Sequence, residues 1–146
     1  MIHATRELAV VAAVAALLAS GEAVAQQIRA KAEVTCRPAP DVLEYDCTVT
    51  LTNARTRAPL PGVELTIGAD MPSMPGAHSV APVKTAPGAA PGTYQGRLAL
   101  EMHGDWALSL NLAGPLRDRV VKVLRFEPDS VGEPAARTAP GRRPRH

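Results

Sequence analysis

The sequence predicts an all-β protein: an immunoglobulin-like antiparallel β-sandwich of about seven strands that follows an N-terminal signal peptide. Three observations support this prediction. Apolar and polar residues alternate with period two in one segment after another, as in strands with one buried face. No segment after the first 25 residues shows helical periodicity. The 14 prolines and 11 glycines are spread along the chain, which is typical of many short strands joined by turns. A small barrel is the alternative architecture.

The alternating segments give the predicted strands in chain order: 28–36, 45–53, 63–67, 78–85, 94–102, 106–112 and 120–126. The fourth contains Pro82, which lacks an amide donor, so we expect it at a sheet edge. The strongest signal covers 94–112, where two alternating runs flank His103-Gly104-Asp105. We expect this segment to form one long hairpin with a tight turn at its glycine.

The first 25 residues have the three parts of a secretory signal peptide. A short polar segment ends at Arg6, an apolar run covers 8–19, and Ala-Val-Ala at 23–25 is a cleavage site of the small-x-small type. The apolar run is shorter than the roughly 20 residues that a membrane span needs. We therefore expect a mature periplasmic or secreted protein that starts near Gln26 and is not stably inserted in the membrane. An uncleaved N-terminal anchor is the alternative.

One domain is expected, over residues 26–127, because 146 residues leave room for no more than one. Its core must be mainly aliphatic, since 46% of the chain is hydrophobic but only 3% is aromatic. Residues 128–146 contain mostly Pro, Gly, Ala and Arg, and we predict a disordered tail there. The domain itself is nearly neutral in charge, so a nucleic-acid surface is not expected.

Cys36 and Cys47 are the two cysteines of the chain, and both fall on the apolar faces of neighbouring predicted strands. In an oxidising compartment such a pair is expected to form a disulfide. Closing so short a loop would stabilise the fold by about 2–3 kcal/mol. A metal or redox site is the alternative, although the spacing is not Cys-x-x-Cys.

Sulfur and imidazole side chains are concentrated in two short runs, 70–78 and 101–106. These runs contain every methionine except the initiator and every histidine between the signal peptide and the tail: Met71, Met74, His78, Met102 and His103. Thioether sulfur is a soft ligand and imidazole a borderline one, a combination that suits copper, and Cu(I) in particular. We therefore predict a copper site formed by these five residues. The alternatives are that the methionines fill gaps in an aliphatic core, as Met102 beside Leu100 would, and that the histidines are ordinary surface residues.

Four motifs of the chain resemble the YtkA-like/FixH-like domain family: PGV at 61–63, DMPSMP at 70–75, PGTY at 91–94 and LEMHGDWAL at 100–108. The resemblance spans residues 63–126. It implies an exported or membrane-tethered β-sandwich domain, of a kind often encoded near proteins that handle copper or other heavy metals. It does not imply a particular biochemical activity.

No pattern in the chain indicates catalysis, since it has no Ser/His/Asp arrangement, no glycine-rich phosphate loop and no expected free thiol. We therefore expect a non-enzymatic protein that binds or delivers copper and acts with a metal-handling or transporter protein. The alternative is a metal-independent interaction module or accessory subunit. Such a module would present the loop at 70–78 to a transporter or a small apolar ligand.

Overall fold

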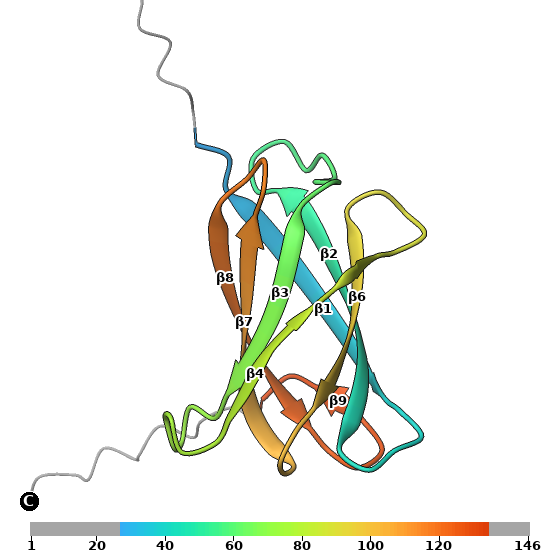
Figure 1. The fold of residues 1–146 in the computed structure, drawn as a ribbon, viewed down its shortest axis with the longest axis vertical. Coiled ribbons are helices and arrows are strands. Elements are labelled where there is room, and N and C mark those ends of the chain that lie inside the picture. Colours follow the sequence, from blue (N-terminus) through green and yellow to red (C-terminus); the bar gives the residue numbers. More distant parts are fainter. Residues whose placement is uncertain (1–26, 135–146) are drawn as a thin grey trace, which may run out of the picture.

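The structure is a computed structural model, and it describes residues 27–134. These residues form two antiparallel β-sheets (Figure 1). The first sheet contains β1 (Ala30–Pro38), β2 (Glu44–Asn53), β5 (Ala86–Pro87) and β6 (Thr93–Ala99). The second contains β3 (Glu64–Asp70), β4 (Ser79–Lys84), β7 (Gly104–Ala113), β8 (Asp118–Phe126) and β9 (Val131–Gly132). No helix within this part of the chain is long and apolar enough to cross a membrane.

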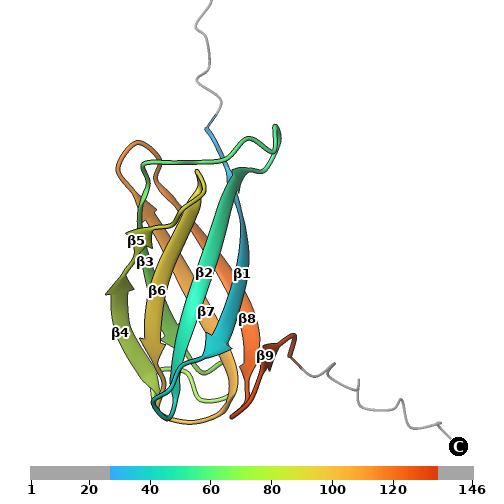
Figure 2. The same ribbon diagram turned by 90° about the vertical axis from the view of Figure 1, so that its right-hand side faces the viewer.

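The two sheets pack face to face, as the side view shows (Figure 2). Their strand orders are β1-β2-β6-β5 and β4-β3-β7-β8-β9. The chain therefore places β1 and β2 in the first sheet, β3 and β4 in the second, β5 and β6 in the first again, and β7 and β8 in the second. This is the strand allocation of an immunoglobulin-like sandwich. The predicted fold class is confirmed.

The core lies between the sheets and follows the alternation of the sequence. In both central strands every second residue is buried: Tyr45, Cys47, Val49 and Leu51 in β2, and Trp106, Leu108, Leu110 and Leu112 in β7. Aromatic rings connect the sheets, because Tyr45 meets Phe126 of β8 edge to face with the ring centroids 4.8 Å apart. The Tyr45 hydroxyl donates a hydrogen bond to the carbonyl of Glu127 (3.0 Å). Burial, together with the charge of Glu127, raises the pKa of Tyr45.

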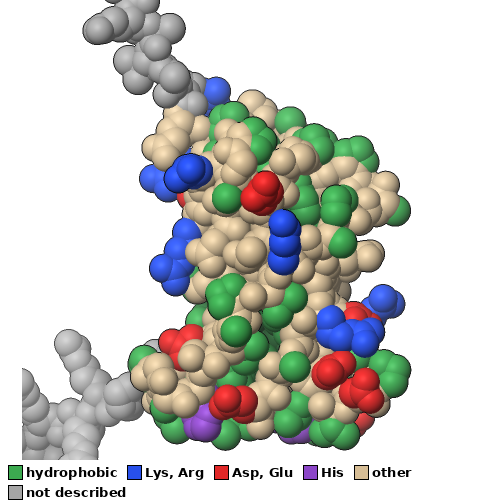
Figure 3. Space-filling model, in the orientation of Figure 1, with side chains coloured by type: hydrophobic (Ala, Val, Ile, Leu, Met, Phe, Trp, Pro, Cys, Tyr) green, Lys and Arg blue, Asp and Glu red, His purple; other side chains and the backbone are tan. Residues whose placement is uncertain are grey.

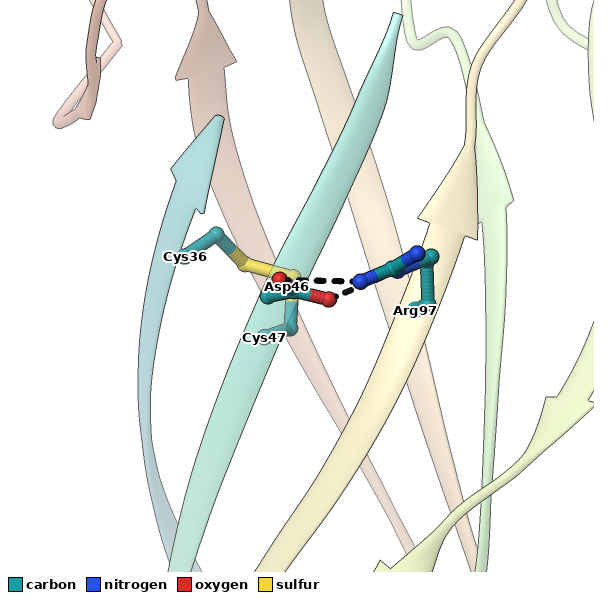
Figure 4. Close-up of a disulfide and its surroundings, with 4 residues drawn as sticks. All are labelled: Cys36, Asp46, Cys47 and Arg97. Atoms are coloured by element: carbon teal, nitrogen blue, oxygen red, sulfur yellow. Dashed lines mark hydrogen bonds and ion pairs between the residues drawn. A yellow bond between two sulfur atoms is a disulfide. The ribbon is translucent and has the colours of Figure 1, made fainter. Parts of the chain in front are cut away.

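The predicted disulfide between Cys36 and Cys47 is confirmed. The two residues face each other in the register of β1 and β2, with their Cα atoms 4.0 Å apart. Beside the disulfide, Arg97 of β6 holds the carboxylate of Asp46 through two hydrogen bonds of 2.8 and 3.2 Å (Figure 4). These bonds, and the positive charges of Arg97 and Arg37, lower the pKa of Asp46.

The predicted hairpin over 94–112 is wrong. β6 pairs with β2 and β5, whereas β7 pairs with β3 and β8, so the two strands belong to different sheets. Alternation shows that a strand has one buried face, but both sheets of a sandwich present that pattern to the core. Residues 100–103 cross between the sheets, a distance of about 10 Å. Gly104 does have the expected unusual backbone, with φ at 134°, although it begins β7.

The shorter strands differ from the prediction in detail. The predicted edge strand is confirmed as β4, which includes Pro82 and lies at the edge of the second sheet. The two-residue strands β5 and β9 were not predicted. Because β9 lies within 128–146, the predicted disorder does not extend to residues 128–134. The rest of that tail, and the predicted signal peptide over 1–25, lie outside the described residues.

Candidate metal site at the loop end of the sandwich

Four loops meet at the lower end of the sandwich in Figure 1, where β1, β3, β6 and β8 end: 39–43, 71–78, 100–103 and 127–130. All five predicted ligands lie in two of these loops. Met71, Met74 and His78 belong to the loop 71–78, and Met102 and His103 belong to the loop 100–103. We call this region the Met/His end.

The loop 71–78 follows β3 directly and folds into consecutive turns. Regular strand structure cannot continue into it, because Pro72 and Pro75 lack amide donors. Three backbone hydrogen bonds close the loop: Met74 N to Met71 O (3.0 Å), Ala77 N to Met74 O (3.1 Å) and Met71 N to His78 O (3.3 Å). The first and last residues of the loop therefore lie side by side.

Carboxylates beside this end have structural partners. Asp70 accepts a hydrogen bond from the amide of Gly76 (3.2 Å), as expected for an aspartate that caps a turn. Asp105 instead accepts a hydrogen bond from Nε of Arg125 (2.8 Å), which raises the pKa of Arg125. Trp106, which follows Asp105, is fully buried in the core.

Met71 and Met74 have different environments within the same loop. The side chain of Met71 turns into the core, and the residue is only 5% exposed. Its Cε lies against Gly104, where an added Cβ would approach it to 3.2 Å. Met74 is 41% exposed. One thioether is therefore part of the sandwich interior, and the other is accessible from solvent.

His78 connects the two loops. Its Nδ1 lies 2.6 Å from Oε2 of Glu101, and their side chains are 29% and 53% exposed. A neutral imidazole that donates from Nδ1 to this carboxylate keeps the lone pair of Nε2 for another partner. The sequence prediction gave Glu101 no role, although Glu101 stands next to Met102 in the run that was singled out.

Met102 and His103 lie on other parts of the Met/His end. Met102 is half-buried and packs against the core, and its carbonyl accepts a hydrogen bond from the indole of Trp106 (3.1 Å). His103 is exposed and lines a hollow together with residues 38–45 and Pro128. The structure thus places His78 beside the loop 100–103, and His103 beside the loop 39–43.

Within residues 27–134, no three His, Cys, Asp or Glu side chains are grouped so that they could hold a metal ion. The thioether sulfurs of Met71 and Met74 are the further candidate ligands beside His78 in the loop 71–78. Sulfur ligands favour a soft ion, and with a single imidazole they suit Cu(I) better than a hard divalent cation.

No curated protein and no solved structure matches the chain. A family model described as YtkA-like matches residues 19–111, well over half of the chain. The matched segment runs from before β1 into β7 and so includes both loops that carry the predicted ligands. The chain therefore belongs to the YtkA-like family.

Proposed function

We propose that this protein is an exported, non-enzymatic copper protein that holds Cu(I) at the loop 71–78 and delivers it to a metal-handling partner. Export is supported by the family, since YtkA-like domains are typical of exported proteins. It is also supported by the disulfide between Cys36 and Cys47, because structural disulfides persist in oxidising compartments.

The observation that carries the proposal is the short contact between His78 and Glu101. Metal-binding histidines usually donate their second ring nitrogen to a carboxylate or carbonyl, which fixes the ring and raises its basicity. Glu101 is in position to do this at Nδ1, and Nε2 is then the coordinating atom.

The thioether of Met74 is the second ligand of the proposed site. It lies four residues before His78 and is exposed, in a loop whose two prolines limit the entropy lost on binding. Met71 would supply a third ligand from the inner side of the same loop. Met102 and His103 are left out of the proposed site, because Met102 packs against the core and His103 lies beside another loop.

The test is a Cu(I) titration of the mature, tag-free protein against a competing chelator. We expect the wild-type protein to bind one Cu(I) with a dissociation constant below about 1 μM. Met74→Leu and His78→Ala should each weaken binding, and Glu101→Gln should weaken it by about 10- to 100-fold through the loss of the carboxylate behind the ring.

Met102→Leu and His103→Ala are the matched controls, since they change the same residue types at the same end of the molecule. Only small effects are expected for them. Binding weaker than micromolar, or unchanged affinity in the triple variant Met71→Leu/Met74→Leu/His78→Ala, would exclude the copper site.

A second function, a metal-independent interaction module, is favoured by apolar exposure at the same end. Val42 of the loop 39–43 is 86% exposed, and Met74 of the loop 71–78 is 41% exposed. Exposed apolar side chains gathered at one end of a domain are common in protein-binding surfaces. This proposal requires that an exported partner co-purifies with the metal-free wild-type protein but not with Val42→Ser/Met74→Ser. Equal recovery with both proteins would count against it.

A further inference from the structure

The loops at the two ends of the molecule carry opposite charges. Four segments at the end opposite the Met/His end cover 27–29, 54–63, 85–92 (which includes the short strand β5) and 114–117, all within the described part of the chain. They contain Arg29, Arg55, Arg57 and Arg117, and no Asp or Glu. The loops of the Met/His end contain Asp41, Glu101, Glu127 and Asp129, and no Lys or Arg. Figure 3 shows most acidic side chains of the visible face towards the lower end. We call the opposite region the Arg end.

Residues at the strand ends offset only part of the positive charge of the Arg end. Asp118, at the start of β8, accepts a hydrogen bond from the amide of Ala30 (2.8 Å) and forms an ion pair with Arg29 (3.6 Å), so it offsets the charge of that arginine. Glu64, at the start of β3, is exposed. Lys84 and Arg119 add two further positive charges at the same end. The Arg end is therefore a cationic surface.

Apolar residues accompany these arginines. Ile28 is 45% exposed beside Arg29. Between the arginines the loops contain prolines and alanines rather than acidic residues, with five exposed prolines: Pro59, Pro61, Pro87, Pro91 and Pro115. Cationic side chains mixed with apolar loop residues suit the interface of an anionic membrane, where guanidinium groups meet phosphates and apolar tips enter the headgroup region.

We propose that the Arg end docks on the surface of an anionic phospholipid membrane. Besides charge complementarity, the position at which the described chain begins supports a membrane as the binding partner of the Arg end. The described chain begins at Gln27 at the Arg end (Figure 1), and the apolar run 8–19 that precedes it is predicted to enter the membrane during export. The domain would thus emerge with its Arg end facing the bilayer and its Met/His end facing away. This inference does not depend on copper binding.

Vesicle flotation tests the proposal, with protein produced from the full-length gene and purified with the N-terminus that the cell leaves on it. We expect binding to vesicles of phosphatidylcholine with phosphatidylglycerol, little binding to phosphatidylcholine alone, and loss of binding at about 0.5 M salt. Arg57→Gln/Arg117→Gln should weaken binding to the anionic vesicles by about 30-fold, from the contribution of each arginine near such a surface.

The matched control is Arg37→Gln/Arg97→Gln, which removes the same amount of charge near the Met/His end, and it should bind like the wild-type protein. Thermal unfolding checks that both variants fold. Equal weakening by the two variants would show that only net charge matters and would overturn the proposal. So would binding to neutral vesicles that resists salt. Absence of binding to anionic vesicles would also overturn it and would point to an acidic protein partner for the Arg end.

Discussion

At the scale of the residue, Met71 and Met74 show how one side-chain type takes two environments three positions apart. Met71 follows a strand and turns into the core, whereas Met74 sits on the turns and meets solvent. A thioether packs well against aliphatic side chains and also coordinates soft metals, so burial alone does not decide its role. Replacing either methionine by leucine removes the sulfur at nearly constant volume, so that an effect on packing can be told apart from an effect on metal coordination.

The first prediction concerns Met71. Met71→Ala should lower the free energy of unfolding by about 2–5 kcal/mol, because it leaves a cavity against Gly104. Met71→Leu nearly conserves the volume and should cost less than about 1.5 kcal/mol. Urea unfolding measures both. If Met71→Leu keeps stability and loses Cu(I) affinity, Met71 is a ligand. Unchanged stability of Met71→Ala would contradict its place in the core.

A second prediction at this scale follows from the lowered pKa of Asp46. A carboxyl group whose pKa is lower in the folded state stabilises the fold above its unfolded pKa of about 3.9, and this contribution is lost as the pH falls through the folded value. Asp46→Asn should therefore lower the urea midpoint at neutral pH and have a smaller effect at pH about 3, below the unfolded pKa. The effect should be small, because the pair with Arg97 is exposed.

Asp129→Asn, in the exposed turn after β8, is the control for this measurement, since it removes a carboxylate without touching Arg97. If Asp46→Asn destabilised the protein equally at both pH values, the loss would come from packing or hydrogen bonding rather than from charge.

At the scale of the element, the sequence predicted where strands lie better than which strands pair. β2 and β7 were located nearly to the residue, because their buried residues are large and strictly alternate. The partners of β6 and β7 could not be predicted, since both strands present the same apolar face to one shared core. β5 and β9, at two residues each, are too short to show periodicity.

The candidate site was predicted as a set of residue types, but its geometry was not. The loop 71–78 could be placed from its prolines, and its methionines and histidine stand out from a chain with few of either. The contact of His78 with Glu101 could not be predicted, because it depends on β3 and β7 being neighbours in the second sheet. The placement of His103 beside the loop 39–43 depends on the crossing at 100–103.

The disulfide gives a prediction for an element pair, β1 and β2. Cys36→Ala/Cys47→Ala should lower the free energy of unfolding by about 2–3 kcal/mol, because the unfolded chain loses its cross-link. Urea unfolding without reductant measures the difference. Wild-type protein treated with reductant is the control, and its urea midpoint should approach that of the variant. If the reduced wild-type protein instead kept the urea midpoint of the untreated protein, the cross-link would not stabilise the fold.

At the scale of the whole molecule, each sheet has a well-protected centre and weak edges. β2 and β7 hydrogen-bond to a strand on each side, and their inner faces are fully buried. β4 pairs on one side only, contains Pro82 and has an irregular register with β3 between Ile67 and Ala69. The loop 71–78 connects β3 to this edge strand. The proposed metal loop is therefore attached to a part of the sandwich that can open without unfolding the rest.

Hydrogen exchange followed by mass spectrometry tests this distribution of stability. Amides of β2 and β7 should exchange slowest, at rates set by global unfolding, and amides of β4 and the loop 71–78 should exchange orders of magnitude faster through local opening. If the loop binds Cu(I), the ion should slow exchange there and in β4, whose opening releases it, and also in β2, because binding to the folded state raises the free energy of global unfolding. Protection of β4 equal to that of β7 in the metal-free protein would contradict a weak edge. Joint protection of β6 and β7, with fast exchange in β2 and β3, would instead support the hairpin that the structure excludes.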